Sequence, residues 1–213
     1  IWPLIRQNIK KQNPNSALIG EVIENATHYL QGDKFDSVTN YRFRSAVLKS
    51  FLIRGDAEEA QHILKNLLQS YPQESIGAAM NLLSSHDTSR ALFYLDSGGN
   101  ETQGVTAKNK ENFDYERGKK LLKLALVFQM GFVGIPTIYY GDEAGLFGAS
   151  TPDNRRTFPW GHEDHDLLTF YKDMIQWRKA NQKILTQGEV KFLYAKKNVF
   201  VFKRSLNRSL ILA

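Results

Sequence analysis

The sequence of 213 residues contains no cysteine and no long run of apolar residues. Without cysteine, the protein has neither a disulfide framework nor a metal or redox site built on thiolates. A membrane-spanning helix needs about 18 or more consecutive apolar residues, so we expect no membrane partner. These absences favour a cytoplasmic protein. The first residue is not methionine, and an upstream signal peptide therefore stays an open alternative.

Charge is also modest, and it is not concentrated in one block. The sequence has 28 Lys and Arg residues against 22 Asp and Glu residues, which gives a net charge of +6. Its lysines occur in short groups along the chain, for example at 10–11, 119–120 and 196–197. This spread is typical of solvated helix and loop surfaces and not of a nucleic-acid groove. We expect no nucleic-acid partner and no cofactor.

Short apolar segments alternate with segments of helical periodicity over the first 180 residues. The expected strands cover residues 17–22, 37–41, 76–83 and 135–140. The expected helices cover residues 1–11, 43–53, 57–71, 115–130 and 164–180, and the polar stretch 95–114 is expected to be an exposed loop. Asp56 is expected to cap the helix over 57–71. In the helix over 115–130 we expect a buried face made of Leu121, Leu122, Leu124, Ala125 and Phe128. Strands alternating with helices predict a parallel sheet in an α/β fold. Four such units would make half of an eight-fold barrel.

The periodicity changes after residue 181. Residues 188–194 and 199–203 alternate between apolar and polar side chains, and 210–212 are apolar. This pattern predicts antiparallel strands. We therefore expect a partial barrel over residues 1–181 and the beginning of an antiparallel β domain over residues 182–213. The sequence starts in a helical pattern and stops in an expected strand, so we expect that both ends are cut from a longer protein.

Acidic residues follow three of the four expected strands. Glu21 ends the first strand, His86 and Asp87 follow the third, and Asp142 and Glu143 follow the fourth. The carboxyl ends of parallel barrel strands meet at one rim, where active sites lie. Paired carboxylates at such a rim suit acid/base or nucleophilic chemistry on a glycosidic bond. Binding of a hard cation by the same oxygens is a competing interpretation, and His86–Asp87 alone also fits a helix cap beside a structural histidine.

Five segments carry a resemblance to a known family. The segments LIGE (18–21), NLLSSHDT (81–88) and GIPTIYYGDE (134–143) resemble three motifs of the α-amylase family of glycoside hydrolases, in the family's order. The segments GDKFD (32–36) and DNRRTFPW (153–160) are most similar to its cyclomaltodextrinase, neopullulanase and maltogenic amylase branch. The resemblance implies a (β/α)8 TIM barrel, of which this chain would carry strands five to eight.

The resemblance also implies a substrate and roles for three residues. The substrate class is α-glucans of the starch type, maltooligosaccharides or cyclodextrins, cleaved with retention of configuration. Glu21 would be the general acid/base, Asp87 the transition-state stabiliser, and His86 a hydrogen-bond donor to the same sugar, with no metal. An ionised Asp87 agrees with the positive charge of an oxocarbenium-like transition state. We expect Asp142 and Glu143 to shape the last strand's rim.

Two departures from the family pattern limit the interpretation. The family's nucleophile is an aspartate at the end of strand four, which would lie before Ile1, so we expect the 213 residues alone to be inactive. In addition, residues 22–25 are VIEN, where many members of this branch carry a tetrapeptide containing tryptophan. The balance between hydrolysis and transglycosylation therefore stays open.

Three further expectations concern surfaces. Arg90 is expected to be a surface cation. The two open edges of a half barrel predict self-association of the chain, because unpaired strand edges recruit other strands. We also expect the apolar side chains of the inner face to be wetted in a monomer, with Leu18, Ile19, Val38, Leu82 and Ile138 as candidates. The alternative to a hydrolase is a non-catalytic barrel of amylase type that serves as a scaffold or interaction domain.

Overall fold

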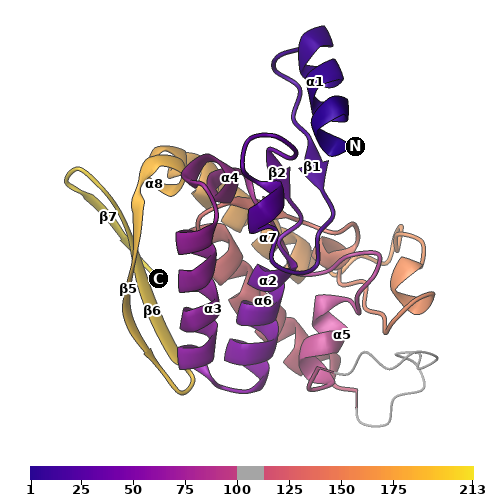
Figure 1. Ribbon diagram of the computed structural model, residues 1–213. Coiled ribbons are helices and arrows are strands. Elements are labelled where there is room, and N and C mark those ends of the chain that lie inside the picture. Colours follow the sequence, from indigo (N-terminus) through magenta and orange to yellow (C-terminus); the bar gives the residue numbers. More distant parts are fainter. Residues whose placement is uncertain (100–112) are drawn as a thin grey trace.

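Short parallel strands alternate with helices along the first 180 residues (Figure 1). The computed structural model describes residues 1–99 and 113–213. Strand β1 pairs with β2 in parallel, and β3 pairs with β4 in parallel. A parallel bridge between Thr39 and Met80 joins the two pairs. The strands are parallel, as predicted, but shorter than the apolar segments suggested: β1 (Ile19–Gly20), β2 (Ser37–Val38), β3 (Met80–Leu82) and β4 (Ile135–Thr137).

The longest helices begin at the capping residues that the sequence provides. Asp56, Asp114 and Asp164 each accept a hydrogen bond from the backbone N–H three residues later. Such caps satisfy N–H groups that a first helical turn leaves unpaired. The helices are α1 (Trp2–Gln12), α2 (Tyr41–Arg44), which continues as the π-helix η2 (Ser45–Ile53), α3 (Ala57–Ser70), α4 (Gln73–Ala78), α5 (Ala91–Asp96), α6 (Tyr115–Gly131), α7 (His165–Ala180) and α8 (Gln182–Gln187). Short 3-10 turns are η1 (Thr27–Tyr29), η4 (Asp142–Ala144) and η5 (Asp153–Arg155).

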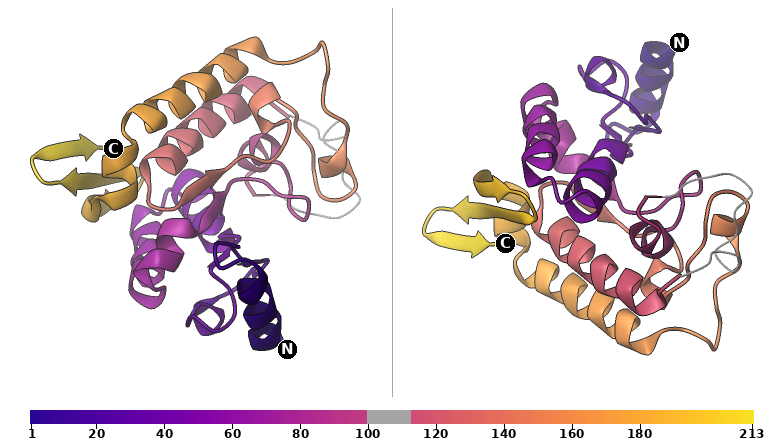
Figure 2. Two further views of the ribbon diagram at one scale, coloured as in Figure 1. Left: turned by 90° about the horizontal axis from the view of Figure 1, so that it is seen from above. Right: turned by 90° about the horizontal axis from the view of Figure 1, so that it is seen from below.

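An antiparallel sheet lies at one side of the molecule, and α6 and α7 run alongside each other (Figure 2). Its strands are β5 (Glu189–Lys196), β6 (Val199–Leu206) and β7 (Ser209–Leu212), in that order. The antiparallel pairing agrees with the alternation in the sequence. Phe128 of α6 lies 5.0 Å from Phe202 of β6 between ring centroids, within a larger group of packed phenylalanines. This aromatic core fixes the sheet against the helices.

Helix α1 projects from the rest of the molecule (Figure 1) and has no buried residue. Arg6 and Lys10 of this helix form ion pairs with Asp36, at 2.7 Å and 3.2 Å. These contacts tie α1 to the segment just before β2. Among residues 1–99 and 113–213, no helix has both the length and the apolar character that crossing a membrane requires.

Three expectations from the sequence are corrected. Residues 76–78 belong to α4 and not to a strand, because Pro72 starts a helix there and an apolar run alone does not distinguish helix from strand. Leu95 and Asp96 end the buried helix α5 and are not part of a loop, while residues 100–112 of that expected loop lie outside the described residues. Leu124 was expected on the buried face of α6 and is 49% exposed.

Candidate active site

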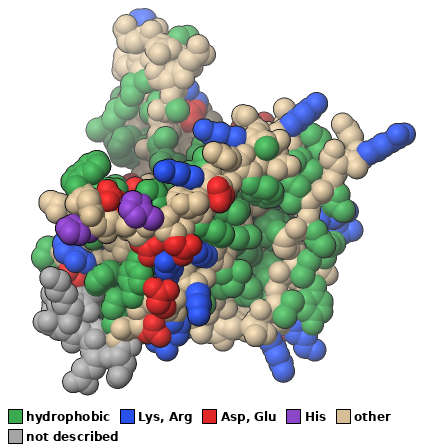
Figure 3. All heavy atoms as spheres, turned by 180° about the vertical axis from the view of Figure 1, so that it is seen from behind, with side chains coloured by type: hydrophobic (Ala, Val, Ile, Leu, Met, Phe, Trp, Pro, Cys, Tyr) green, Lys and Arg blue, Asp and Glu red, His purple; other side chains and the backbone are tan. Residues whose placement is uncertain are grey.

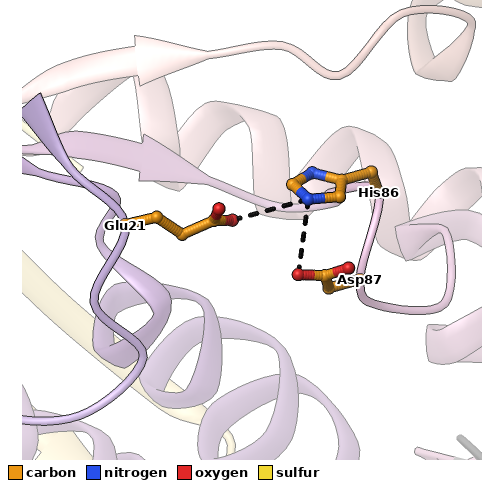
Figure 4. Close-up of side chains that lie close together, drawn as sticks. All are labelled: Glu21, His86 and Asp87. Atoms are coloured by element: carbon orange, nitrogen blue, oxygen red, sulfur yellow. Dashed lines mark ion pairs between the residues drawn. The ribbon is translucent and has the colours of Figure 1, made fainter.

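Glu21, His86 and Asp87 come together beyond the ends of β1 and β3 (Figure 4). The Nε2 atom of His86 lies 3.8 Å from Oε1 of Glu21 and 3.3 Å from Oδ2 of Asp87. All three side chains are about half exposed. Glu21 and His86 line a cavity of about 280 Å³, and Asp87 lies beside His86. The structure therefore brings together the three residues to which the sequence analysis gave catalytic or binding roles.

Local packing explains how Glu21 reaches this position. A Cβ atom on Gly20 would lie 2.4 Å from the ring of Phe35, so only glycine fits directly before Glu21. This close approach lets β1 end against Phe35, and the chain then turns so that Glu21 faces the turn that carries His86.

Tyr41 was not identified from the sequence, and it contacts Glu21 directly. Its hydroxyl donates to Oε1 of Glu21 at 2.9 Å and lies 3.1 Å from Oγ of Ser85. Burial, together with the Glu21 carboxylate, raises the pKa of Tyr41 to about 12, so the hydroxyl keeps its proton at neutral pH. The sequence analysis placed Tyr41 at the end of a strand, whereas Asn40 caps a helix that begins at Tyr41.

The turn that carries His86 and Asp87 is held by its own side chains. The backbone N–H of Ser85 donates to Oγ1 of Thr88 at 3.1 Å, and the N–H of Asp87 donates to Oγ of Ser85 at 3.1 Å. Nη2 of Arg155 lies 3.1 Å from Oδ1 of Asp87.

Arg90 is fully buried, so the expectation of a surface cation was wrong. Its Nη1 lies 3.0 Å from Oδ1 of Asp142 and donates to the carbonyl of Tyr140 at 2.7 Å. The guanidinium carbon also lies 4.4 Å from the ring centroid of Tyr139. Local sequence around Arg90 does not reveal these partners, because they come from the segment after β4.

Asp142 pairs with Arg90 below the rim, and neither Asp142 nor Glu143 lines the cavity that Glu21 faces. Burial of the Asp142 carboxyl outweighs the attraction of Arg90 and raises its pKa to about 6. Within the described residues, the acids after β4 therefore do not join the cluster formed by Glu21, His86 and Asp87.

The raised pKa of Asp142 predicts a specific dependence of stability on pH. Its pKa rises from 3.8 to about 6 on folding, so between these values the folded state holds a proton that the unfolded state has lost. The free energy of unfolding should thus fall by about 3 kcal/mol as the pH rises through this window. Urea unfolding of the purified protein and of Asp142→Asn tests this. Between pH 4 and 6.5 the wild type should lose about 2 of these 3 kcal/mol relative to the variant, and a constant difference would contradict the raised pKa.

The same cluster has to be considered as a metal site. Glu21, His86 and Asp87 each offer one ligand atom, and these atoms lie within 4.8 Å of one another. Two of the three already have cationic or hydrogen-bonding partners, Arg155 at Asp87 and Tyr41 at Glu21. A guanidinium 3.1 Å from one carboxylate opposes a second cation at the same oxygens. The arrangement therefore fits acid/base chemistry better than cation binding.

Comparison with known proteins gives consistent matches. A family model described as alpha amylase, catalytic domain, matches residues 1–162. An amylopullulanase from Thermoanaerobacter thermohydrosulfuricus is 39% identical over 96% of this chain and 14% of its own length. A cyclomaltodextrinase from a Bacillus species is 37% identical over 92% of this chain and 32% of its own length.

A solved structure of a cyclomaltodextrinase superposes on the whole chain. Its TM-score is 0.82 at 35% sequence identity, and the match covers 100% of this chain and 34% of that one. The chain thus spans about a third or less of the relatives that it matches.

Proposed function

The chain belongs to the α-amylase family of glycoside hydrolases, and from that membership we propose that it forms strands five to eight of a (β/α)8 barrel in a longer retaining α-glucan hydrolase. The observation that carries the proposal is the cluster of Glu21, His86 and Asp87 at the carboxyl ends of parallel strands, with Glu21 and His86 in the lining of one cavity. Active sites of such barrels lie at this end.

Glu21 is proposed as the general acid/base. In the first step it protonates the glycosidic oxygen as the bond from that oxygen to C1 breaks, and in the second it removes a proton from the attacking water. The Tyr41 hydroxyl occupies Oε1, which leaves Oε2 to exchange the proton. This hydrogen bond also fixes the carboxyl group in one orientation.

Asp87 is proposed to stabilise the positive charge that develops on the sugar in the transition state. Its Oδ1 is paired with the Arg155 guanidinium at 3.1 Å, and its Oδ2 lies 3.3 Å from Nε2 of His86. His86 donates a hydrogen bond to a hydroxyl of the same sugar. The nucleophile is proposed to be an aspartate of the preceding barrel strand, outside these 213 residues, so the chain alone is expected to be inactive.

The proposed substrates follow from the relatives. Proteins named amylopullulanase and cyclomaltodextrinase match this chain over more than nine-tenths of its length. We therefore propose starch-type glucans, maltooligosaccharides or cyclodextrins as substrates.

The test is turnover of maltotriose and β-cyclodextrin by the full-length protein, with the product followed by NMR before it mutarotates. Retention requires that the α-anomer appears first. Initial release of the β-anomer, or no turnover of any of these glucans, would contradict the proposal.

The isolated chain of 213 residues is also proposed to self-associate, and the described surface supports this in part. Ile19 of β1 and Ile135 of β4 are 51% and 50% exposed at the two outer strands. A groove of about 540 Å³ also runs along β4 and α7, with Val133, Ile138 and Ile175 in its lining. Hydrophobic side chains are exposed over much of the face seen in Figure 3.

Three side chains that we expected to be wetted in a monomer are buried instead. Leu18, Val38 and Leu82 are 8%, 1% and 3% exposed. The apolar surface available for association is therefore smaller than the sequence suggested, and it centres on Ile19 and Ile135.

Sedimentation of the purified chain at micromolar concentration tests self-association. We expect dimers or larger species, and Ile135→Lys should shift the distribution toward monomer because a charge at a strand edge blocks pairing. Leu4→Lys on the exposed helix α1 is the matched control. A cooperatively melting monomer of the unsubstituted chain would show that the strand edges do not drive association.

A further inference from the structure

The segment after the last parallel strand returns to the turn that carries His86 and Asp87. Asn154 lies in η5 and is fully buried. Its Nδ2 atom is 2.8 Å from the carbonyl oxygen of His86, 2.9 Å from that of Thr88 and 3.4 Å from that of Ser85. One side chain thus contacts the backbone at three of the four positions in the turn.

The chemistry of the amide fixes the orientation of Asn154. The NH2 group has two hydrogens to donate, and three carbonyl oxygens surround it. The flipped orientation would place Oδ1 against these oxygens and is therefore unfavourable. Oδ1 itself is buried and has no hydrogen-bond partner among the described residues. The hydrogen bonds of this side chain are therefore all directed to the turn.

Asn154 is held from behind by the buried ion pair. Its carbonyl oxygen accepts a hydrogen bond from Nε of Arg90 at 3.0 Å, and Arg90 is paired with Asp142 at 3.0 Å. Asn154 is thus connected, through Arg90, to the segment directly after β4. By contrast, the contacts from Arg155 and Thr151 to the His86 carbonyl lie at the exposed surface, where solvent competes for them.

We propose that Asn154 is a positioning residue that sets the orientation of the turn at residues 85–88, and with it the His86 ring and the Asp87 carboxylate opposite Glu21. The effect on kcat that we expect from this role rests on the proposed hydrolase function. Both His86 and Asp87 are half exposed, so their own side chains have little packing to fix them. The backbone bonds from Asn154 supply this constraint.

The test compares Asn154→Leu, which keeps the approximate shape and removes both donors, with Asn181→Leu in the full-length enzyme. Asn181 also donates from Nδ2 to a backbone carbonyl, that of Trp177 at 2.8 Å, at the far end of α7. A misplacement of about 1 Å costs on the order of 100-fold in rate. We expect kcat of Asn154→Leu to fall by about this factor with KM changed less than about threefold, and kcat of Asn181→Leu to stay near the parental value.

Amide hydrogen exchange of residues 85–88 provides a readout that does not depend on catalysis. Loss of the anchoring hydrogen bonds should speed this exchange roughly tenfold in Asn154→Leu and leave it unchanged in Asn181→Leu. If Asn154→Leu does not fold, Asn154→Ala replaces it. We then expect a smaller fall in kcat and a smaller rise in the exchange rate, because water can enter and bridge the carbonyls.

The outcomes separate this proposal from the proposed function. A folded Asn154 variant with parental kcat or unchanged exchange at residues 85–88 overturns the positioning role, as does an equal loss of kcat in Asn181→Leu. If the wild-type enzyme hydrolyses no glucan, the proposed function fails, and the exchange measurement alone decides whether Asn154 anchors the turn.

Discussion

Glu21→Gln in the full-length enzyme is expected to reduce turnover of maltooligosaccharides by about 10²- to 10⁴-fold, the usual contribution of general acid–base catalysis. Glutamine has the shape of glutamate but cannot protonate the leaving oxygen. The Tyr41 hydroxyl, 2.9 Å from Oε1 of Glu21, can still donate to the amide oxygen, so the local geometry should persist. Circular dichroism and steady-state kinetics on maltotriose measure the two effects separately.

A substrate with a different leaving group and a control variant test this prediction further. A substrate with a good leaving group, such as 4-nitrophenyl α-maltoside, needs little protonation, so formation of the covalent intermediate should be less affected. Glu74→Gln is the matched control, because Glu74 is an exposed glutamate that does not line the cavity and should retain parental rates. Near-parental hydrolysis of maltotriose by Glu21→Gln would show that Glu21 is not the acid.

Asp87→Asn is expected to lower kcat by about 10²- to 10³-fold, the typical cost of removing one preorganised electrostatic contact to the transition state. The substitution removes the negative charge beside the developing oxocarbenium ion and the ion pair with Arg155. Because charge develops on the sugar whatever the leaving group is, 4-nitrophenyl α-maltoside and maltotriose should be affected alike. This pattern differs from the one expected for Glu21→Gln.

Asp33→Asn is the matched control for Asp87. Asp33 is also an exposed aspartate in an ion pair, with Lys34 at 3.2 Å, and it lies outside the cluster of Glu21, His86 and Asp87. The control should leave kcat within about twofold, since surface ion pairs contribute little. If Asp87→Asn keeps kcat within a factor of about ten, the charge of Asp87 does not stabilise the transition state.

The cluster of Glu21, His86 and Asp87 was predictable because each residue follows an apolar strand segment, and parallel strands end at one rim. Capping residues such as Asp56 and the alternation after residue 188 were local signals, and the structure confirms what they predicted. Strand lengths were less predictable. The segment 17–22 forms a strand only at residues 19–20, because pairing depends on neighbours that the local sequence does not specify.

The residues that sequence reasoning missed or misplaced act across long sequence separations. Arg90 pairs with Asp142, 52 residues later, and Asn154 contacts the turn about 66 residues earlier. A charged or amide residue next to a loop has no local pattern that reveals such a partner. Tyr41 was closer to prediction. It comes three residues after the end of β2 and directly after the helix cap Asn40, and this position alone places it near the rim.

The most direct test of the role of Glu21 is azide rescue of Glu21→Ala in the full-length enzyme, with 4-nitrophenyl α-maltoside as substrate. Azide needs no general base, so it can attack C1 of the covalent glycosyl-enzyme, forming the C1–N bond as the bond between C1 and the nucleophile's carboxylate oxygen breaks. If Glu21 is the acid/base, azide restores turnover and NMR identifies the product as the α-glycosyl azide. A β-glycosyl azide would make Glu21 the nucleophile, and no effect of azide on a variant with parental activity would remove Glu21 from the mechanism.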